Sequence, residues 1–166
     1  SVALKAGGTE ARYTCNGVVD TAAGPLDNLA NLLTAGAGAV TYVQGQFRLH
    51  AAAYDSSSGE LNLGMLAGEV QLDARVSRKE LFNAVRGTYV DPDKLWQATD
   101  FPPVTNATYE AQDNGEQIFK DFELPFTTGA ERAQRLAKIA LEKGRQGIRV
   151  TLPVNHSALK YSVYDV

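Results

Sequence analysis

Three pieces of sequence decide the fold: KELFNAVRGTYV at 79–90, DPDKLWQATDFPP at 91–103 and IFKDFELPF at 118–126. The first and third predict strands, because β-branched and aromatic residues cluster in them between Gly and Pro. Residues 91–116 keep neither a strand period nor a helix period, so we predict a long loop there. Loops of this length are usually functional or disordered, and the aromatic side chains of this one argue against disorder.

The residues before this stretch predict a small αβ lobe over residues 1–68. Pro25 has the fixed φ that suits the first position of a helix, and we expect a helix over about 25–36. Apolar residues recur along it at i, i+3, i+4 spacing, namely Leu26, Leu29, Ala30, Leu33 and Ala37. A hairpin is expected over about 39–53, with a glycine at its tight turn.

Residues 69–166 predict a β-rich, barrel-like lobe that contains the long loop. Alternation of apolar and polar residues over 68–76 is typical of a half-buried strand. A helix is expected over 129–143, because Thr128 and Glu131 have the spacing of a capping box. Further strands are expected at 148–152 and 160–164. The expected fold class is α+β, with a small helix-plus-hairpin lobe packed beside a β-barrel-like or strongly bent antiparallel sheet with one crossover helix.

Composition narrows the possible partners. The chain has 166 residues and a formal net charge of -3, which argues against a dedicated nucleic-acid or anionic-membrane surface. Its apolar runs are shorter than the roughly 20 residues that span a bilayer, and residues 1–5 lack the apolar core of a signal peptide. Cys15 is the only cysteine, so no internal disulfide forms. We expect a strand over 10–19 with Tyr13 and Cys15 on its buried side, where Cys15 is a small apolar residue.

Acidic residues are the natural candidates for catalysis. A carboxylate pair for glycoside cleavage could come from Asp91, Asp93, Asp100, Glu110, Asp113 or Glu116. These residues lie in turn-like contexts, where Asp is favoured for local backbone hydrogen bonds. A calcium loop beginning at Asp91 fails, because its sixth residue is Trp96 and its twelfth is Pro102. Two histidines and one cysteine are too few to predict zinc, and no phosphate-binding loop is present. We therefore predict no enzyme, no metal and no cofactor.

The long loop carries the candidate interface. Its aromatic and proline residues either fold onto the protein's own sheet or form a subunit contact, in which a few aromatic anchors supply most of the binding energy. Both readings stay open for the candidate interface residues Trp96, Phe101, Pro102, Pro103 and Tyr109.

Residues 80–90, 96–109 and 123–141 resemble the central tail-hub, tip-attachment protein J-like family of long-tailed, lambda-like bacteriophages. Residues 13–21 (YTCNGVVDT) are similar to the same family, and the resemblance covers most of the chain. It implies an internal piece of a hub protein, with a structural role in assembly at the distal end of the tail tube. The virion tail tip is then its location, after synthesis and assembly in the cytoplasm of the bacterial host.

The resemblance also implies partners. These are sister hub subunits in a trimer, the distal tail protein and the tape-measure protein, with no membrane or nucleic-acid site in these residues. Two alternatives remain at this point: a cell-wall-degrading module and a host-glycan-binding module of a tail tip. Exposed aromatic side chains would form the glycan platform.

Overall fold

The computed structural model describes residues 1–3, 7–43, 45–53, 56–57, 59–74, 80–162 and 164. The fold is α+β, as predicted. Its helices are α1 (Pro25–Thr34), α2 (Ala107–Gln112) and α3 (Ala130–Gly144), with short 3-10 turns η1 (Leu63–Met65), η2 (Pro92–Lys94) and η3 (His156–Lys160). Its strands are β1 (Val2–Ala3), β2 (Thr9–Glu10), β3 (Ala39–Val43), β4 (Gln46–His50), β5 (Gln71–Asp73), β6 (Ala84–Asp91), β7 (Gln97–Thr105), β8 (Phe119–Leu124) and β9 (Arg149–Thr151).

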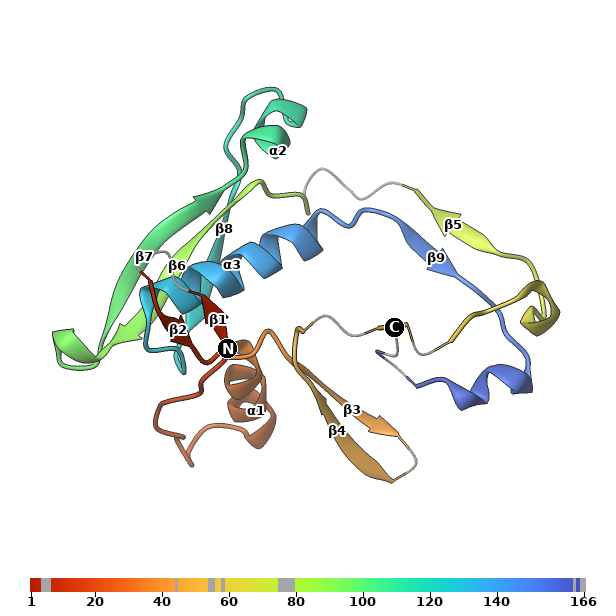
Figure 1. Ribbon diagram of the computed structural model, residues 1–166, viewed down its shortest axis with the longest axis horizontal. Coiled ribbons are helices and arrows are strands. Elements are labelled where there is room, and N and C mark those ends of the chain that lie inside the picture. The colour runs from red at the N-terminus through yellow and green to blue at the C-terminus, as the bar shows by residue number, and fades with distance from the viewer. Residues whose placement is uncertain are drawn as a thin grey trace.

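A sheet of strand order β7-β6-β8, called the central sheet below, lies toward one end of the long axis, and α3 packs along it (Figure 1). Strand β6 pairs antiparallel with β7 and parallel with β8. Gly87 lets β6 and β8 approach closely, because a Cβ there would lie 1.8 Å from the carbonyl oxygen of Phe122. The core between sheet and helix consists of Phe82, Val85, Tyr89, Phe101, Leu124, Ala133, Leu136, Ala137 and Leu141.

Helix α3 starts close to the predicted residue but without the predicted cap. Its N-cap is Gly129, which makes no side-chain hydrogen bond, so the capping box was wrong. The Thr128 hydroxyl instead accepts from Asn16 Nδ2 at 3.1 Å. Two arginines of the helix, Arg132 and Arg135, pair with Glu10 at 3.1 Å and 2.6 Å. These pairs hold the amino-terminal segment against the helix.

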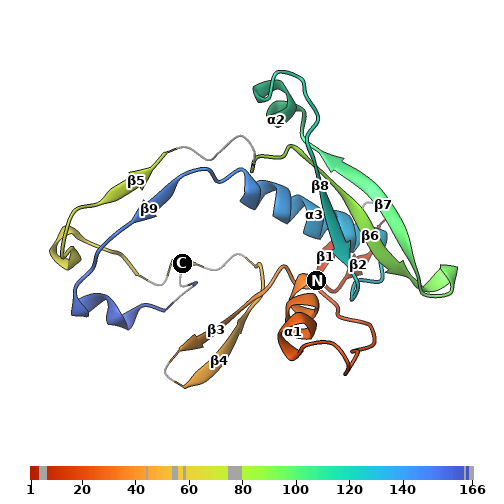
Figure 2. The ribbon, with the colours of Figure 1, turned by 180° about the vertical axis from the view of Figure 1, so that it is seen from behind.

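Two of the three two-stranded ribbons in the described residues, the β3–β4 hairpin and the β5–β9 ribbon, extend away from this sheet, and the third is the short β1–β2 pair (Figures 1 and 2). The β5–β9 ribbon lies at one end of the long axis, and the turn between β6 and β7 lies at the other. A bridge between Leu66 and Val154 continues the β5–β9 pairing toward η1 and η3.

The predicted loop over 91–116 was wrong, because it contains η2, β7 and α2. Strand β7 has a free outer edge, and edge strands tolerate the two prolines that hide its strand pattern. The sheet is mixed rather than antiparallel, and it closes no barrel in the described part of the chain.

Three predicted strands also differ from the structure. The strand over 10–19 is wrong beyond Glu10, where β2 ends. The strand over 160–164 is wrong at its start, because η3 runs to Lys160; residue 163 lies outside the described residues. Strand β5 is shorter than the 68–76 expected, and residues 75–76 also lie outside the described residues. The division at residue 68 stays a prediction.

Candidate functional site

The turn between β6 and β7 presents Trp96 to solvent. Leu95 and Trp96 both have positive φ, at 56° and 60°, a conformation that crowds the Cβ of an L-residue. Asp91 holds the turn: its Oδ1 accepts from the Asp93 amide, and its carbonyl accepts from the Trp96 amide, each at 3.0 Å. Leu95 is 84% exposed and Trp96 is 61% exposed. The structure thus places this candidate interface residue at the surface.

The candidate residues on β7 separate into a buried one and two exposed ones. Phe101 is 2% exposed and belongs to the core cluster, so it packs within its own chain. Pro102 and Pro103 are exposed on an edge strand, where the missing N–H groups block pairing with a further strand. Pro102 lies six positions after Trp96 along the chain, about 20 Å at the usual rise of a strand. The structure does not bring the five candidate residues together.

Tyr109, on α2, is used mainly within the chain. Its hydroxyl donates to Glu142 Oε2 at 2.5 Å, and the Arg145 guanidinium lies 4.9 Å from its ring centroid. The hydrogen bond to the Glu142 carboxylate raises the pKa of Tyr109, and burial and the Glu142 charge add to the rise. The ring is half-buried against the core. Tyr109 therefore fixes α2 to α3.

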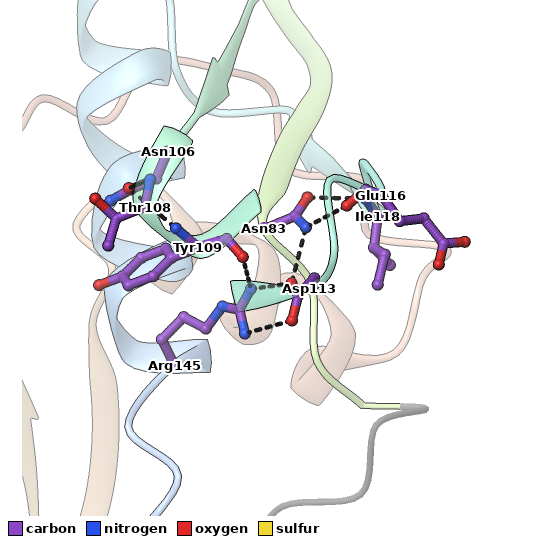
Figure 3. A network of polar contacts seen from close by, with 8 residues as sticks. All are labelled: Asn83, Asn106, Thr108, Tyr109, Asp113, Glu116, Ile118 and Arg145. Atoms are coloured by element: carbon purple, nitrogen blue, oxygen red, sulfur yellow. Dashed lines mark hydrogen bonds and ion pairs between the residues drawn. The ribbon is translucent and has the colours of Figure 1, made fainter. Parts of the chain in front are cut away.

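A buried polar network holds the segment around α2 (Figure 3). Asn83, which is 1% exposed, donates to Asp113 Oδ2 at 2.8 Å and to the Glu116 carbonyl at 2.7 Å. Its own Oδ1 accepts from the Ile118 amide at 2.8 Å. Arg145, the C-cap residue of α3, forms an ion pair with Asp113, and both side chains are 9% exposed. These contacts explain how a segment without sequence periodicity is nevertheless ordered, and Asn83 is the residue that the sequence gave no reason to single out.

Three of the six acidic residues considered for catalysis, Asp91, Glu110 and Asp113, have carboxylates engaged in local contacts. Asp91 accepts from the Tyr89 hydroxyl at 3.2 Å and lies 4.0 Å from Lys94 Nζ. Burial and the charge of Asp91 raise the pKa of Tyr89. Glu110 accepts from Gln117 Nε2 at 3.2 Å. Within the described ranges no group of three or more His, Cys, Asp or Glu side chains could hold a metal ion.

Of the remaining candidate side chains, Cys15 and His50 line one open pocket beside α1. Cys15 is exposed, so the expectation of a buried cysteine was wrong; the strand that would have buried it ends at Glu10. His50 Nε2 lies 3.1 Å from Thr41 Oγ1 across the β3–β4 hairpin, while His156 begins η3. No helix of the part that the structure describes is long and apolar enough to cross a membrane.

The β5–β9 ribbon carries apolar side chains on one side only. Leu72 pairs with Val150, whereas the neighbouring pairs are polar, Gln71 with Thr151 and Asp73 with Arg149. Because side chains alternate along a strand, the same side continues through further apolar residues. We call this the apolar ribbon face: Val70, Leu72, Ile148, Val150 and Leu152. Its residues are between 36% and 69% exposed, so the half-buried strand expected here is uncovered.

The β3–β4 hairpin repeats this pattern. Tyr42 pairs with Phe47 and their ring centroids lie 4.8 Å apart, while Leu49 continues the same side. These three side chains are 65%, 75% and 72% exposed, respectively. Thr41 and His50 occupy the opposite, polar side. Both ribbons therefore show water an apolar surface that a sheet would normally cover.

Comparisons with known proteins identify the family of this chain. A family model described as "Putative phage tail protein" matches residues 25–166. The chain belongs to this phage tail protein family. Over 132 residues it is 26% identical to the baseplate hub protein pb3 of Escherichia phage T5, and the match covers 78% of this chain and 14% of that protein. This phage tail chain thus spans a small part of the length of the relative, and it is a structural component of the virion tail.

Proposed function

We propose that this phage tail chain is an assembly module of the hub at the distal end of the tail tube, with the apolar ribbon face covered by neighbouring subunits. The similarity to a baseplate hub protein supports the place in the tail. Sister subunits in a trimer are the proposed first partners, and the distal tail protein and the tape-measure protein are the proposed next ones.

The exposed apolar ribbon face carries this proposal. A two-stranded ribbon is at best marginally stable alone in water, because it buries little apolar surface. Contiguous exposed apolar patches mark interaction surfaces in soluble proteins. A neighbouring subunit packed on Leu72 and Val150 would bury this patch and complete a core that the chain leaves open on that side.

Adjacent residues of β5 provide a matched test. Leu72→Lys places a charge on the apolar ribbon face, and Gln71→Lys places the same charge on the polar face one residue away. We expect Leu72→Lys to lower incorporation into tails by about tenfold or more, because desolvating a charge opposes packing, and Gln71→Lys to change it little. Electron microscopy of tails from cells that co-express the tail proteins gives the readout, and circular dichroism checks that both variants fold. Equal incorporation of the two variants would contradict the proposal.

The proposal includes no catalytic role. The acidic candidates Asp91, Glu110 and Asp113 are held in local hydrogen bonds and ion pairs, as a structural module requires. Suspended peptidoglycan should keep its turbidity in the presence of the chain. A loss of turbidity that disappears when one of these carboxylates is substituted would contradict the absence of a catalytic role.

A further inference from the structure

We propose that the β6–β7 turn of one copy inserts Trp96 into an apolar pocket beside α1 of a second copy. This inference rests on the proposed assembly role and names one contact by which copies of the chain would join.

The β6–β7 turn holds Leu95 and Trp96 in a backbone conformation that large side chains rarely adopt. The connection from β6 to β7 has five residues, 92–96, and positions with positive φ usually take Gly, Asn or Asp. Here Leu95 and Trp96 occupy those positions, at roughly 1–2 kcal/mol of strain each, and both remain exposed. The turn also projects from the body of the molecule in both views (Figures 1 and 2). Strain of this kind concentrates at functional positions, and a projecting indole fits an anchor that enters a partner.

The same chain has a receiving pocket. An open pocket of about 310 Å³ lies between α1, β4 and the segment before α1. Its volume is at the lower end of the range for ligand pockets, which suits one bulky aromatic side chain. A buried indole also needs a partner for its N–H, and Thr14 and His50 in the lining carry polar atoms. The apolar part of the lining includes Tyr13, Leu32, Leu33, Ala35 and Leu49.

The charges around the two surfaces are opposite in sign. Two carboxylates, Asp91 and Asp93, and one ammonium, Lys94, surround Trp96. On the pocket side, Arg132 donates to the hydroxyl of Thr14 in the lining, and it shares a single carboxylate, Glu10, with Arg135. Such complementarity favours tip-to-pocket encounters and disfavours contact between two identical turns. Because turn and pocket are different surfaces, the contact is head-to-tail, and it closes a ring or continues as a filament.

One substitution tests the contact by cross-linking. Cys15 lines the pocket and is the only cysteine, and Trp96 is the only tryptophan. Leu95→Cys keeps the indole and puts a second thiol beside it at the tip of the turn. Under mild oxidation we expect disulfide-linked copies on a non-reducing gel, and we expect them to disappear when Cys15→Ser is added. Leu72→Cys, on the β5–β9 ribbon, is the control, and it should give at least tenfold less product with Cys15.

The native indole gives an independent readout. Its fluorescence should shift to shorter wavelength as the wild-type chain is concentrated, because insertion removes Trp96 from water. Capping Cys15 with N-ethylmaleimide fills part of the pocket and should move the shift to at least tenfold higher concentration. Equal cross-linking of Leu72→Cys, or an indole that stays in water while the chain associates, would overturn the inference. Loss of assembly in Leu72→Lys with no tip cross-link would leave the assembly role intact, whereas no association of any kind would remove both.

Discussion

The central sheet and the β5–β9 ribbon use the same alternation of side chains with opposite results. On β6, Val85 and Tyr89 lie under α3 and are at most 9% exposed. On β5 and β9, Leu72 and Val150 are 62% and 50% exposed. Alternation therefore shows which side of a strand is apolar, but it does not show what covers that side.

The difference lies in the connections. The core is assembled from consecutive elements between Phe82 and Leu141, so helix α3 returns directly over the sheet that precedes it. The ribbon pairs residues 71–73 with 149–151, and the described residues leave its apolar ribbon face 36–69% exposed. Such a ribbon stabilises the chain only when another surface covers its apolar side. In the proposed assembly, a neighbouring subunit supplies that surface.

The sharpest way to break this comparison is the same substitution made in the central sheet and on the other uncovered ribbon, the β3–β4 hairpin. Phe101→Ala removes a ring that is 2% exposed, and we expect it to lower the free energy of unfolding by about 4 kcal/mol. Phe47→Ala removes a ring that is 75% exposed on the β3–β4 hairpin, and it should cost less than about 0.5 kcal/mol in the isolated chain. Urea titrations followed by circular dichroism measure both. Comparable losses would mean that the hairpin is part of the monomer's core.

Much of the fold follows from local patterns. The 3.6-residue period of α1 and α3 locates both helices to within two residues, because their apolar stripes are regular. The hairpin at 39–53 and the strands that became β6 and β8 follow from their β-branched and aromatic residues. These elements are predictable because neighbouring residues carry the signal.

The remainder depends on long-range contacts. Strand β7 was hidden by Pro102 and Pro103, which an edge strand tolerates, and α2 is too short for a helical period. The aromatics Trp96 and Phe101 look alike in sequence, yet one is exposed at a turn and the other is buried in the core. Phe101 lies in the core because its strand pairs it with Gly87 of β6. The sequence of one strand does not show which residues it pairs with.

A buried and an exposed ion pair give a second comparison between the core and the surface, and the buried pair is Asp113–Arg145. Asp113→Asn keeps the shape of the side chain but leaves the buried Arg145 cation without its counter-charge, and we expect a loss of about 3 kcal/mol of stability. Asp121→Asn breaks a pair with Arg86 whose Asp121 side chain is 74% exposed, and solvent screening should make its effect much smaller than that of Asp113→Asn. Thermal and urea unfolding at pH 7 measure the difference. Equal effects would show that water reaches the Asp113 network.

The smallest expected effect on stability is at Tyr109, which lies between the core and the surface. Its folded-state pKa is raised, chiefly by the hydrogen bond to Glu142, so the folded chain holds the phenolic proton more tightly than the unfolded chain does. That contribution to stability is complete below the ordinary tyrosine pKa of about 10 and is lost as pH rises through the folded-state value. Tyr109→Phe should therefore flatten the fall of stability above about pH 10, measured as urea midpoints along a pH series. Glu142→Gln removes the charge that disfavours the phenolate and should flatten the same limb of the curve. An unchanged alkaline slope in both variants would mean that Tyr109 titrates as freely in the folded chain as in the unfolded one, and that α2 is held by Asn83 and Arg145 alone.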